Sequence, residues 1–248
     1  MSNQETIESV VQYIQIIDKI KSENEGAGNN AELLFRGQRQ DKSLLPKIAR
    51  LNLNGSLKKV EKLMLDEFRR ACVPLAEFQP ENNWDLLALA QHHGLPTRLL
   101  DWSYSALVAL WFAVQNEPAI GDDGQPENGV VWVLCANVTD FRDTQAFEDP
   151  LDNKSTKIFR SKVISKRISA QSGAFTVHRI LPKDIIVPFE KHGQFSGKLV
   201  KLLIPHSSFA SIRKSLSLVG INHAQIFPDI DGLCQHLERR FSKLGDEI

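Results

Sequence analysis

The sequence predicts an α+β fold, with helices in the N-terminal half and a β-rich second half. Residues 7–20 and 57–72 repeat apolar side chains at the three- and four-residue spacing of a helix. Residues 129–135 form a short, β-branched apolar run after a turn-rich loop, and residues 199–204 alternate, which is typical of strands. Because 42% of the 248 residues are hydrophobic, the chain can bury a large core in one domain.

We expect residues 31–248 to form one compact unit, with a helix and a loop over residues 1–30 packed on it. Residues 21–30 are polar and contain two glycines, so the first helix should end before them. The N-terminus lacks a basic segment followed by an apolar run, and no apolar stretch approaches membrane-spanning length. We therefore predict a cytoplasmic protein with no membrane partner.

Composition excludes several classes of protein. Thirty basic and thirty acidic residues cancel, so no overall electric field draws the chain to nucleic acid or to an anionic membrane. Cys72, Cys135 and Cys234 lie far apart, without the spacing of a zinc site or of a disulfide framework. We accordingly expect no metal site and a reducing compartment.

A first strand is expected over residues 32–38, and it ends in the triplet Phe35-Arg36-Gly37. The triplet alone has two interpretations. Arg36 is either a surface residue beside a turn glycine or an anion clamp, whose planar guanidinium binds phosphate or carboxylate while Gly37 lets the ligand approach the backbone. In the following helix, over residues 57–72, the charged residues, including Glu61, are predicted to face solvent.

A further helix begins near residue 85 and runs into residues 91–103, the part of the chain richest in polar chemistry. His92 and His93 can cap the last carbonyls of that helix or face a site. Residues 94–96 form a turn, and residues 97–101 are predicted to be a strand.

Two further features make this stretch a candidate site. Arg98 and Asp101 can form a buried ion pair that fixes the corner. Asp101, Ser103 or Ser105 can cap the helix predicted over residues 105–114, where free N–H groups favour anions. This crowding of polar groups exceeds what packing requires, so we expect a functional site.

The second half of the chain is predicted to hold strands at 174–180 and 184–187 and a helix at 206–217. The Asp-rich turn at 227–232 lacks the oxygens of a calcium loop and is interpreted as the entry to a helix. Five basic residues around 157–167 most simply form a solvated face, with a nucleic-acid track as the alternative.

Several motifs together resemble the FRG domain family, which is named for its aromatic-Arg-Gly triplet. They are residues 35–37, 90–103, 109–113, 170–175 and 227–232. The resemblance covers residues 35 to 236, and it implies little about activity.

A second resemblance, to the Arg-Ser-Glu class of ADP-ribosyltransferases, implies a mechanism and a split sheet. In that class an aromatic-Arg-Gly motif ends one strand, a serine motif precedes a helix, and a glutamate lies on a later strand. The resemblance implies that Arg36 binds the phosphates of NAD, that Ser103 holds a ribose and that Trp102 or Trp111 stacks on a ring. Gln171 lies where the class has its glutamate, and an amide supplies neither negative charge nor a base at neutral pH.

We therefore predict an ADP-ribosyltransferase-like enzyme of phage defence or stress response, with NAD as cofactor and a protein or nucleic-acid acceptor. The alternatives are a non-catalytic module that binds a nucleotide or phosphorylated partner, and a nuclease. Residues 36, 92–103 and 171 should converge in space. The predicted catalytic residues are Arg36, His92, His93, Ser103 and Gln171, and the predicted cofactor contacts are Arg36, Gly37, Gln38, Thr97, Arg98, Asp101 and Trp102.

Overall fold

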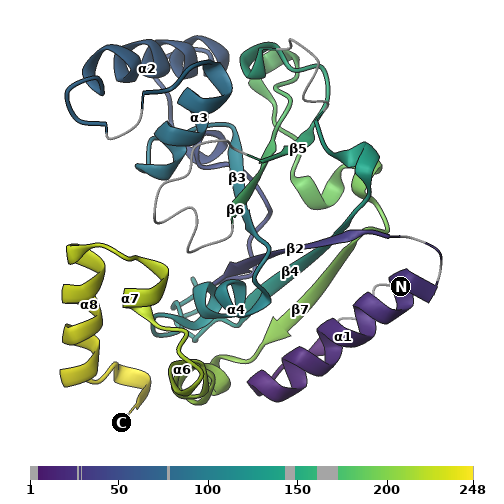
Figure 1. The fold of residues 1–248 in the computed structure, drawn as a ribbon, viewed down its shortest axis with the longest axis vertical. Coiled ribbons are helices and arrows are strands. Elements are labelled where there is room, and N and C mark those ends of the chain that lie inside the picture. Colours follow the sequence, from purple (N-terminus) through teal and green to yellow (C-terminus); the bar gives the residue numbers. More distant parts are fainter. Residues whose placement is uncertain are drawn as a thin grey trace.

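The computed structural model describes residues 5–26, 28, 30–76, 79–142, 149–160 and 173–247. Within these residues a seven-stranded sheet is covered by helices, which confirms the α+β class (Figure 1). The strands are β1 (Glu5–Thr6), β2 (Glu32–Gln38), β3 (Leu99–Ser103), β4 (Gly129–Ala136), β5 (Lys157–Phe159), β6 (Gly173–Val177) and β7 (Leu199–Ile204). The helices are α1 (Val10–Gly26), α2 (Leu57–Ala71), α3 (Asn83–His92), α4 (Ala106–Val114), α6 (Phe209–Leu218), α7 (His223–Ile226) and α8 (Ile230–Phe241).

The sheet has the order β1-β7-β4-β2-β3-β6-β5 and is antiparallel except where β1 pairs with β7. It divides between β2 and β3. β2 pairs with β4 along its whole length, but with β3 only at Phe35 and Ser103. In Figure 1, β3 and β6 consequently run across the direction of β2, β4 and β7. The geometry is that of a split sheet, with its opening beside Arg36.

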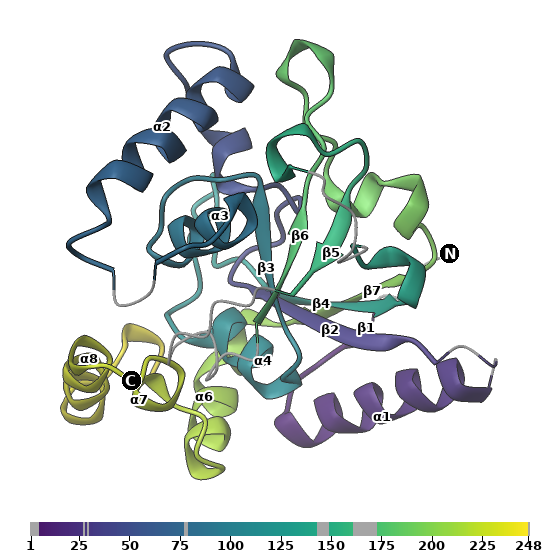
Figure 2. The same cartoon turned by 45° about the horizontal axis from the view of Figure 1, so that its top comes forward.

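Helices cover the two parts of the sheet separately. α1, α4 and α6 pack on one face of β2, β4 and β7, in a core that includes Tyr13, Leu110 and Phe209. α2 and α3 pack on β3, β5 and β6. Figures 1 and 2 agree in placing α2 and α3 on the far side of the sheet from α1 and α6, with α4 beside the division. No helix in the described part of the chain combines the length and apolar character that a membrane crossing requires.

Most elements confirm the sequence-based predictions, with three differences. α1 continues through residues predicted to be a loop and ends at Gly26, because the polar residues 21–25 are compatible with a helix. Residues 184–187 form no strand. Lys183 and Asp184 adopt left-handed conformations there and leave only an isolated bridge between Leu181 and Ile185. The short strands β1 and β5 had no distinct sequence signal.

Two helix starts confirm their predicted caps. The Ser105 hydroxyl accepts a hydrogen bond from the Val108 N–H at the start of α4. The Asp229 carboxylate accepts one from the Gly232 N–H at the start of α8, so the Asp-rich turn is a helix entry.

Gly37 allows β2 and α4 to touch through their backbones. A Cβ atom at this position would lie 1.8 Å from the Ala109 carbonyl oxygen and 2.8 Å from the Ala113 nitrogen. Neither atom can move without displacing the helix. Gly37 therefore serves close packing between strand and helix, a role that the ligand-approach interpretation of this glycine did not include.

We expect Gly37→Ala to lower the free energy of unfolding by about 3 kcal/mol, since the methyl group forces α4 away from β2. Urea denaturation followed by circular dichroism measures this loss. Gly26→Ala is the matched control. The space around Gly26, at the end of α1, is open, so alanine there should leave stability unchanged or slightly raised. Equal stabilities of the Gly37→Ala and wild-type proteins would contradict the packing role.

Candidate functional site

A cavity of about 350 Å³ lies where β2 and β3 diverge, between the end of α3 and the side of α4. This volume is at the lower end of the range of small-ligand sites. The residues that give the cavity its chemical character are Arg36, Gln91, His92, Asp101, Ser103 and Phe112. Of the residues predicted to converge, Arg36, His92 and the segment 101–103 do so.

Arg36 lies in β2, next to Phe35, which pairs with Ser103 across the division of the sheet. Its Nη1 atom donates a hydrogen bond of 2.7 Å to the Asp101 carbonyl oxygen and lies 3.9 Å from the Asp101 carboxylate. The side chain is only 19% exposed, and its buried Nε atom has no hydrogen-bond partner among the described residues. A buried donor without an acceptor is costly, so the site favours a ligand that accepts a hydrogen bond there.

Burial lowers the pKa of Arg36, while the neighbouring Asp101 carboxylate acts in the opposite direction and Arg50 adds to the lowering. Arginine stays protonated at any physiological pH. The cavity therefore contains a fixed positive charge with spare hydrogen-bonding capacity.

Asp101 is held at the cavity by a short chain of hydrogen bonds. The Thr97 hydroxyl donates to the Gln91 side-chain oxygen over 2.7 Å, and the Gln91 nitrogen donates to the Asp101 carboxylate over 2.8 Å. The Asp101 side chain is 56% exposed, so its carboxylate is accessible. Thr97 is fully buried and does not line the cavity, so it orients Gln91 rather than contacting a ligand.

Ser103 ends β3 directly before α4. Its hydroxyl accepts a hydrogen bond of 3.0 Å from the Ser105 N–H, which fixes the turn that leads into the helix. The residue lines the cavity beside Phe35 and Arg36. A hydroxyl, a guanidinium and a carboxylate from two adjacent strands thus share one small space.

The two histidines differ in position. His92 is half-buried and lines the cavity, whereas His93 is exposed and is not among the cavity's lining residues. The rings make an edge-to-face contact with centroids 5.1 Å apart. His93 follows the last residue of α3 and its N–H donates to the Leu89 carbonyl oxygen, so it terminates the helix. The paired imidazoles therefore do not act together on a ligand.

The predicted Arg98–Asp101 ion pair is wrong. Three residues apart on an extended chain, these side chains point to opposite faces. Arg98 is instead 1% exposed, and its Nε and Nη2 atoms both donate to the Oε2 atom of Glu61, while the Glu61 Oε1 atom accepts from the Arg98 backbone N–H. Glu61 is fully buried and not on a solvated face as predicted. The Arg98 Nη1 atom also donates to the oxygens of Pro150, Leu151 and Asn153. Arg98 is saturated inside the core, away from the cavity, and cannot bind a ligand.

Neither predicted tryptophan offers its ring for stacking, although Trp102 is among the residues that line the cavity. The Trp102 indole is buried, donates to the Thr176 hydroxyl and packs against Phe189. Trp111 is buried against His223 and Phe227. The half-buried ring of Phe112, one residue further along α4, lines the cavity instead. Helical spacing places Phe112 and Ala109 on one face, a signal that the sequence contained.

For two more predicted positions, no contact with the cavity is described. Gln38 does not line the cavity, and its side-chain nitrogen donates to the Lys42 carbonyl oxygen. Gln171 and most of the basic run at 161–170 lie outside the described residues. Gln91, in contrast, lines the cavity and orients Asp101, a role that the sequence did not suggest.

His178 lies behind Arg36 in the core and responds to its charge. Burial, with smaller effects of His192 and Arg36, lowers the pKa of His178 to about 3. Its Nε2 atom lies 3.2 Å from the Thr176 hydroxyl, and the backbone of Val187 raises the pKa only in part against these effects. The imidazole is therefore neutral in the folded protein.

A pH titration of stability tests this assignment. Because the folded pKa lies below the unfolded value of about 6.5, the neutral ring's contribution is complete above pH 6.5 and is lost as the pH falls toward 3. His178→Gln should remove this component and reduce the loss of stability between pH 6.5 and 4.5 by on the order of 2 kcal/mol. Identical slopes for His178→Gln and wild type would show that His178 is not buried as a neutral group.

Comparison with known proteins finds a family match for one region of the chain. The family model of the FRG domain matches residues 31–120, which include β2, β3, α4 and most of the cavity wall. No curated protein and no solved structure matches the chain significantly. As the motifs at 35–37 and 90–103 predicted, residues 31–120 of this chain carry an FRG domain.

Proposed function

We propose that the cavity between β2 and β3 binds NAD and that the protein is an ADP-ribosyltransferase-like enzyme. The observation that carries this proposal is the meeting of Arg36, Asp101 and Ser103 in one cavity where the sheet divides. This arrangement supplies a cation for phosphate, a hydroxyl for ribose and a carboxylate for the reacting carbon.

Arg36 binds the phosphate groups in this proposal. Its buried Nε atom lacks an acceptor, and a phosphate oxygen satisfies both this donor and the positive charge. The Asp101 carboxylate is 3.9 Å from Nη1, further than a hydrogen bond, so it neutralises the guanidinium only partly. The residues present therefore fit a dianionic ligand.

Ser103 and Phe112 orient the rest of the ligand. Ser103 offers its hydroxyl to a ribose hydroxyl, and its own backbone geometry is fixed by the turn into α4. The Phe112 ring gives the nicotinamide or adenine a flat apolar surface in place of the two tryptophans.

Asp101 takes the part that the glutamate plays in the Arg-Ser-Glu class. Among the described residues that line the cavity it has the one carboxylate. Its negative charge stabilises the positive charge that develops at the ribose carbon as the bond to nicotinamide breaks and nicotinamide leaves with the electron pair. The acceptor then bonds to that carbon and gives up a proton to Asp101 or to water. Gln91, held by Thr97, keeps the carboxylate oriented toward the cavity.

The acceptor in this proposal is a protein or a nucleic acid, and the biological setting is phage defence or a stress response. A non-catalytic module that binds a nucleotide or phosphorylated partner is the second candidate, favoured by Gln171 where the class has glutamate. A nuclease that uses His92, His93 and Asp101 is no longer proposed, because His93, although its ring contacts that of His92, does not line the cavity that His92 and Asp101 share.

We predict that NAD binds the wild-type protein and releases nicotinamide slowly in the presence of a cell extract as acceptor source. Arg36→Lys should weaken NAD binding in calorimetry by roughly 10- to 100-fold, since lysine lacks the planar fork and the Nε donor. Asp101→Asn should bind NAD normally and lose nicotinamide release by roughly 100-fold or more. Release is measured by chromatography with labelled NAD.

Arg39→Ala is the matched control, because Arg39 is exposed in the same segment and does not line the cavity. It should retain both binding and release. NAD binding without nicotinamide release would favour the non-catalytic module. Neither binding nor release by the wild-type protein would overturn the proposal.

A further inference from the structure

A second, larger hollow lies away from the cavity at Arg36. Between α6, α7, α8 and the C-terminal segment there is a groove of about 800 Å³, which we call the C-terminal groove. It shares no lining residue with the cavity between β2 and β3. Its volume is typical of a site for a small organic ligand.

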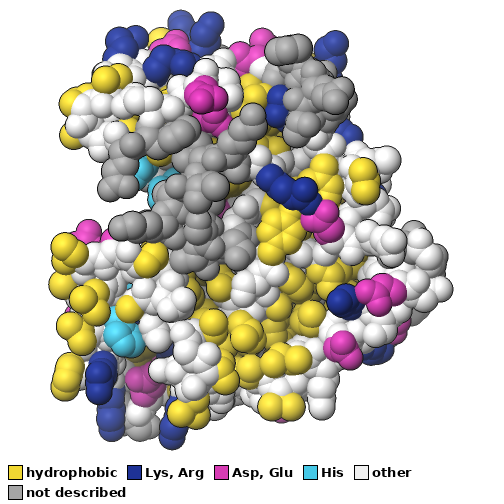
Figure 3. Space-filling model, in the orientation of Figure 1, with side chains coloured by type: hydrophobic (Ala, Val, Ile, Leu, Met, Phe, Trp, Pro, Cys, Tyr) yellow, Lys and Arg dark blue, Asp and Glu magenta, His cyan; other side chains and the backbone are white. Residues whose placement is uncertain are grey.

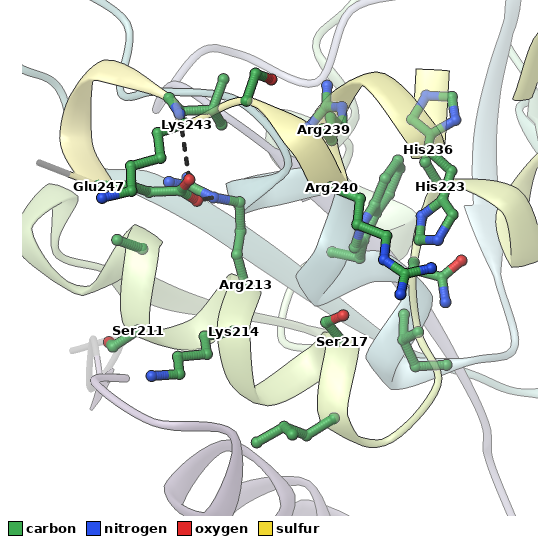
Figure 4. Close-up of a pocket in the computed structure, with 17 residues that line it drawn as sticks. Ser211, Arg213, Lys214, Ser217, His223, His236, Arg239, Arg240, Lys243 and Glu247 are labelled. Carbon is green, nitrogen blue, oxygen red and sulfur yellow. Dashed lines mark hydrogen bonds and ion pairs between the residues drawn. The ribbon is translucent and has the colours of Figure 1, made fainter. Parts of the chain in front are cut away.

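The C-terminal groove is strongly basic, although the whole chain has no net charge. In Figure 3, Lys and Arg side chains gather at the lower left, over α6 and α8. Figure 4 shows the Arg213 side chain of α6 pointing toward Glu247 and the Arg240 side chain of α8 pointing toward α6. The cations that line it are Arg213, Lys214, Arg239, Arg240 and Lys243, against Glu247 as the one lining carboxylate among the described residues.

Two of these cations have structural partners. Arg213 pairs with Asp246 and Glu247 and donates to the Val114 carbonyl oxygen. Arg239 donates to the Gln115 carbonyl oxygen and to the Asn116 side chain. Both therefore hold the C-terminal end of α4, where positive charge complements the helix dipole.

The other three cations have no such partner. Lys214, Arg240 and Lys243 are exposed, and none forms an ion pair with a carboxylate of the described residues. Positive charges also lie close together in the groove. Burial, and to a smaller extent repulsion by the neighbouring Arg213, lowers the pKa of Arg239. A multivalent anion in the groove relieves this repulsion.

The walls between the cations are partly apolar. Leu218, Ile221 and Leu244 line the groove, with Trp111 at its base. Leu218 is 82% exposed and so presents apolar surface at the groove. A ligand that fits both features has phosphate groups at one end and a flat apolar group at the other.

We propose that the C-terminal groove is a second ligand site, for an organic polyphosphate of the nucleoside triphosphate class. Lys214, Arg240 and Lys243 bind the phosphates, and the apolar side chains contact the base. This proposal does not depend on the transferase function assigned to the first cavity.

Isothermal titration with ATP on the full chain tests it. We expect micromolar to sub-millimolar binding, weakened roughly tenfold by each of Lys214→Gln, Arg240→Gln and Lys243→Gln. Arg70→Gln, an exposed cation on α2, is the matched control and should bind like wild type. Thermal melts by circular dichroism check that each variant is folded, and Arg240→Lys should recover most of the affinity.

Further arms separate the alternatives. Arg36→Ala should leave ATP binding unchanged, whereas loss of binding in this variant alone would place ATP in the first cavity and overturn the proposal. Inorganic tripolyphosphate should bind less tightly than ATP, and adenosine much less. If tripolyphosphate bound as tightly as ATP, the proposed contact between the base and the apolar side chains would be wrong. If ATP did not bind at about 1 mM, on the order of the weakest affinity expected, the proposed ligand site would be wrong. Unchanged NAD binding and nicotinamide release in the groove variants would keep the two sites distinct.

Discussion

The backbone contact between β2 and α4 at Gly37 determines where the chemically interesting groups of this protein lie. With no side chain at that position, the helix rests directly on the strand, and a Cβ would lie 1.8 Å from the Ala109 carbonyl oxygen. The helix start, capped by Ser105, is thereby held beside Ser103 at the end of β3. β3 in turn meets β2 at the Phe35–Ser103 pair alone. One glycine thus brings a guanidinium and a hydroxyl from strands far apart in the sequence to the same opening.

Local sequence signals predicted most of the fold and about half of the site. Strand β2, helices α2 and α4 and the caps Ser105 and Asp229 follow from periodicity and from side-chain chemistry within a few residues. Arg98 is a residue whose partner such local signals do not predict. Its partner Glu61 lies 37 positions earlier, on helix α2, and nothing within either segment indicates the other. The two tryptophans illustrate the same limit, because amphipathic side chains suit a core and a ligand site equally until the neighbouring elements are known.

α4 links the two hollows of the molecule. Phe112 lines the cavity at Arg36, and the preceding Trp111 forms the base of the C-terminal groove, with their rings in edge-to-face contact at 5.2 Å. Arg213 and Arg239 hold the C-terminal end of the same helix, directly after these two rings. A short, nearly all-apolar helix therefore supports two polar surfaces. The chain has no net charge, and yet cations are in local excess in the C-terminal groove. Whole-chain composition cannot reveal such a division.

The central claim is that the cavity between β2 and β3 binds NAD. A crystal structure of the protein grown with NAD, or with ADP-ribose, the part of NAD that remains after nicotinamide leaves, tests this claim most directly. The account predicts ligand density between β2 and β3, with a phosphate oxygen within hydrogen-bond distance of the Arg36 Nε atom and a ribose beside Ser103. Density at another place, or a ligand whose phosphates do not contact Arg36, would contradict it.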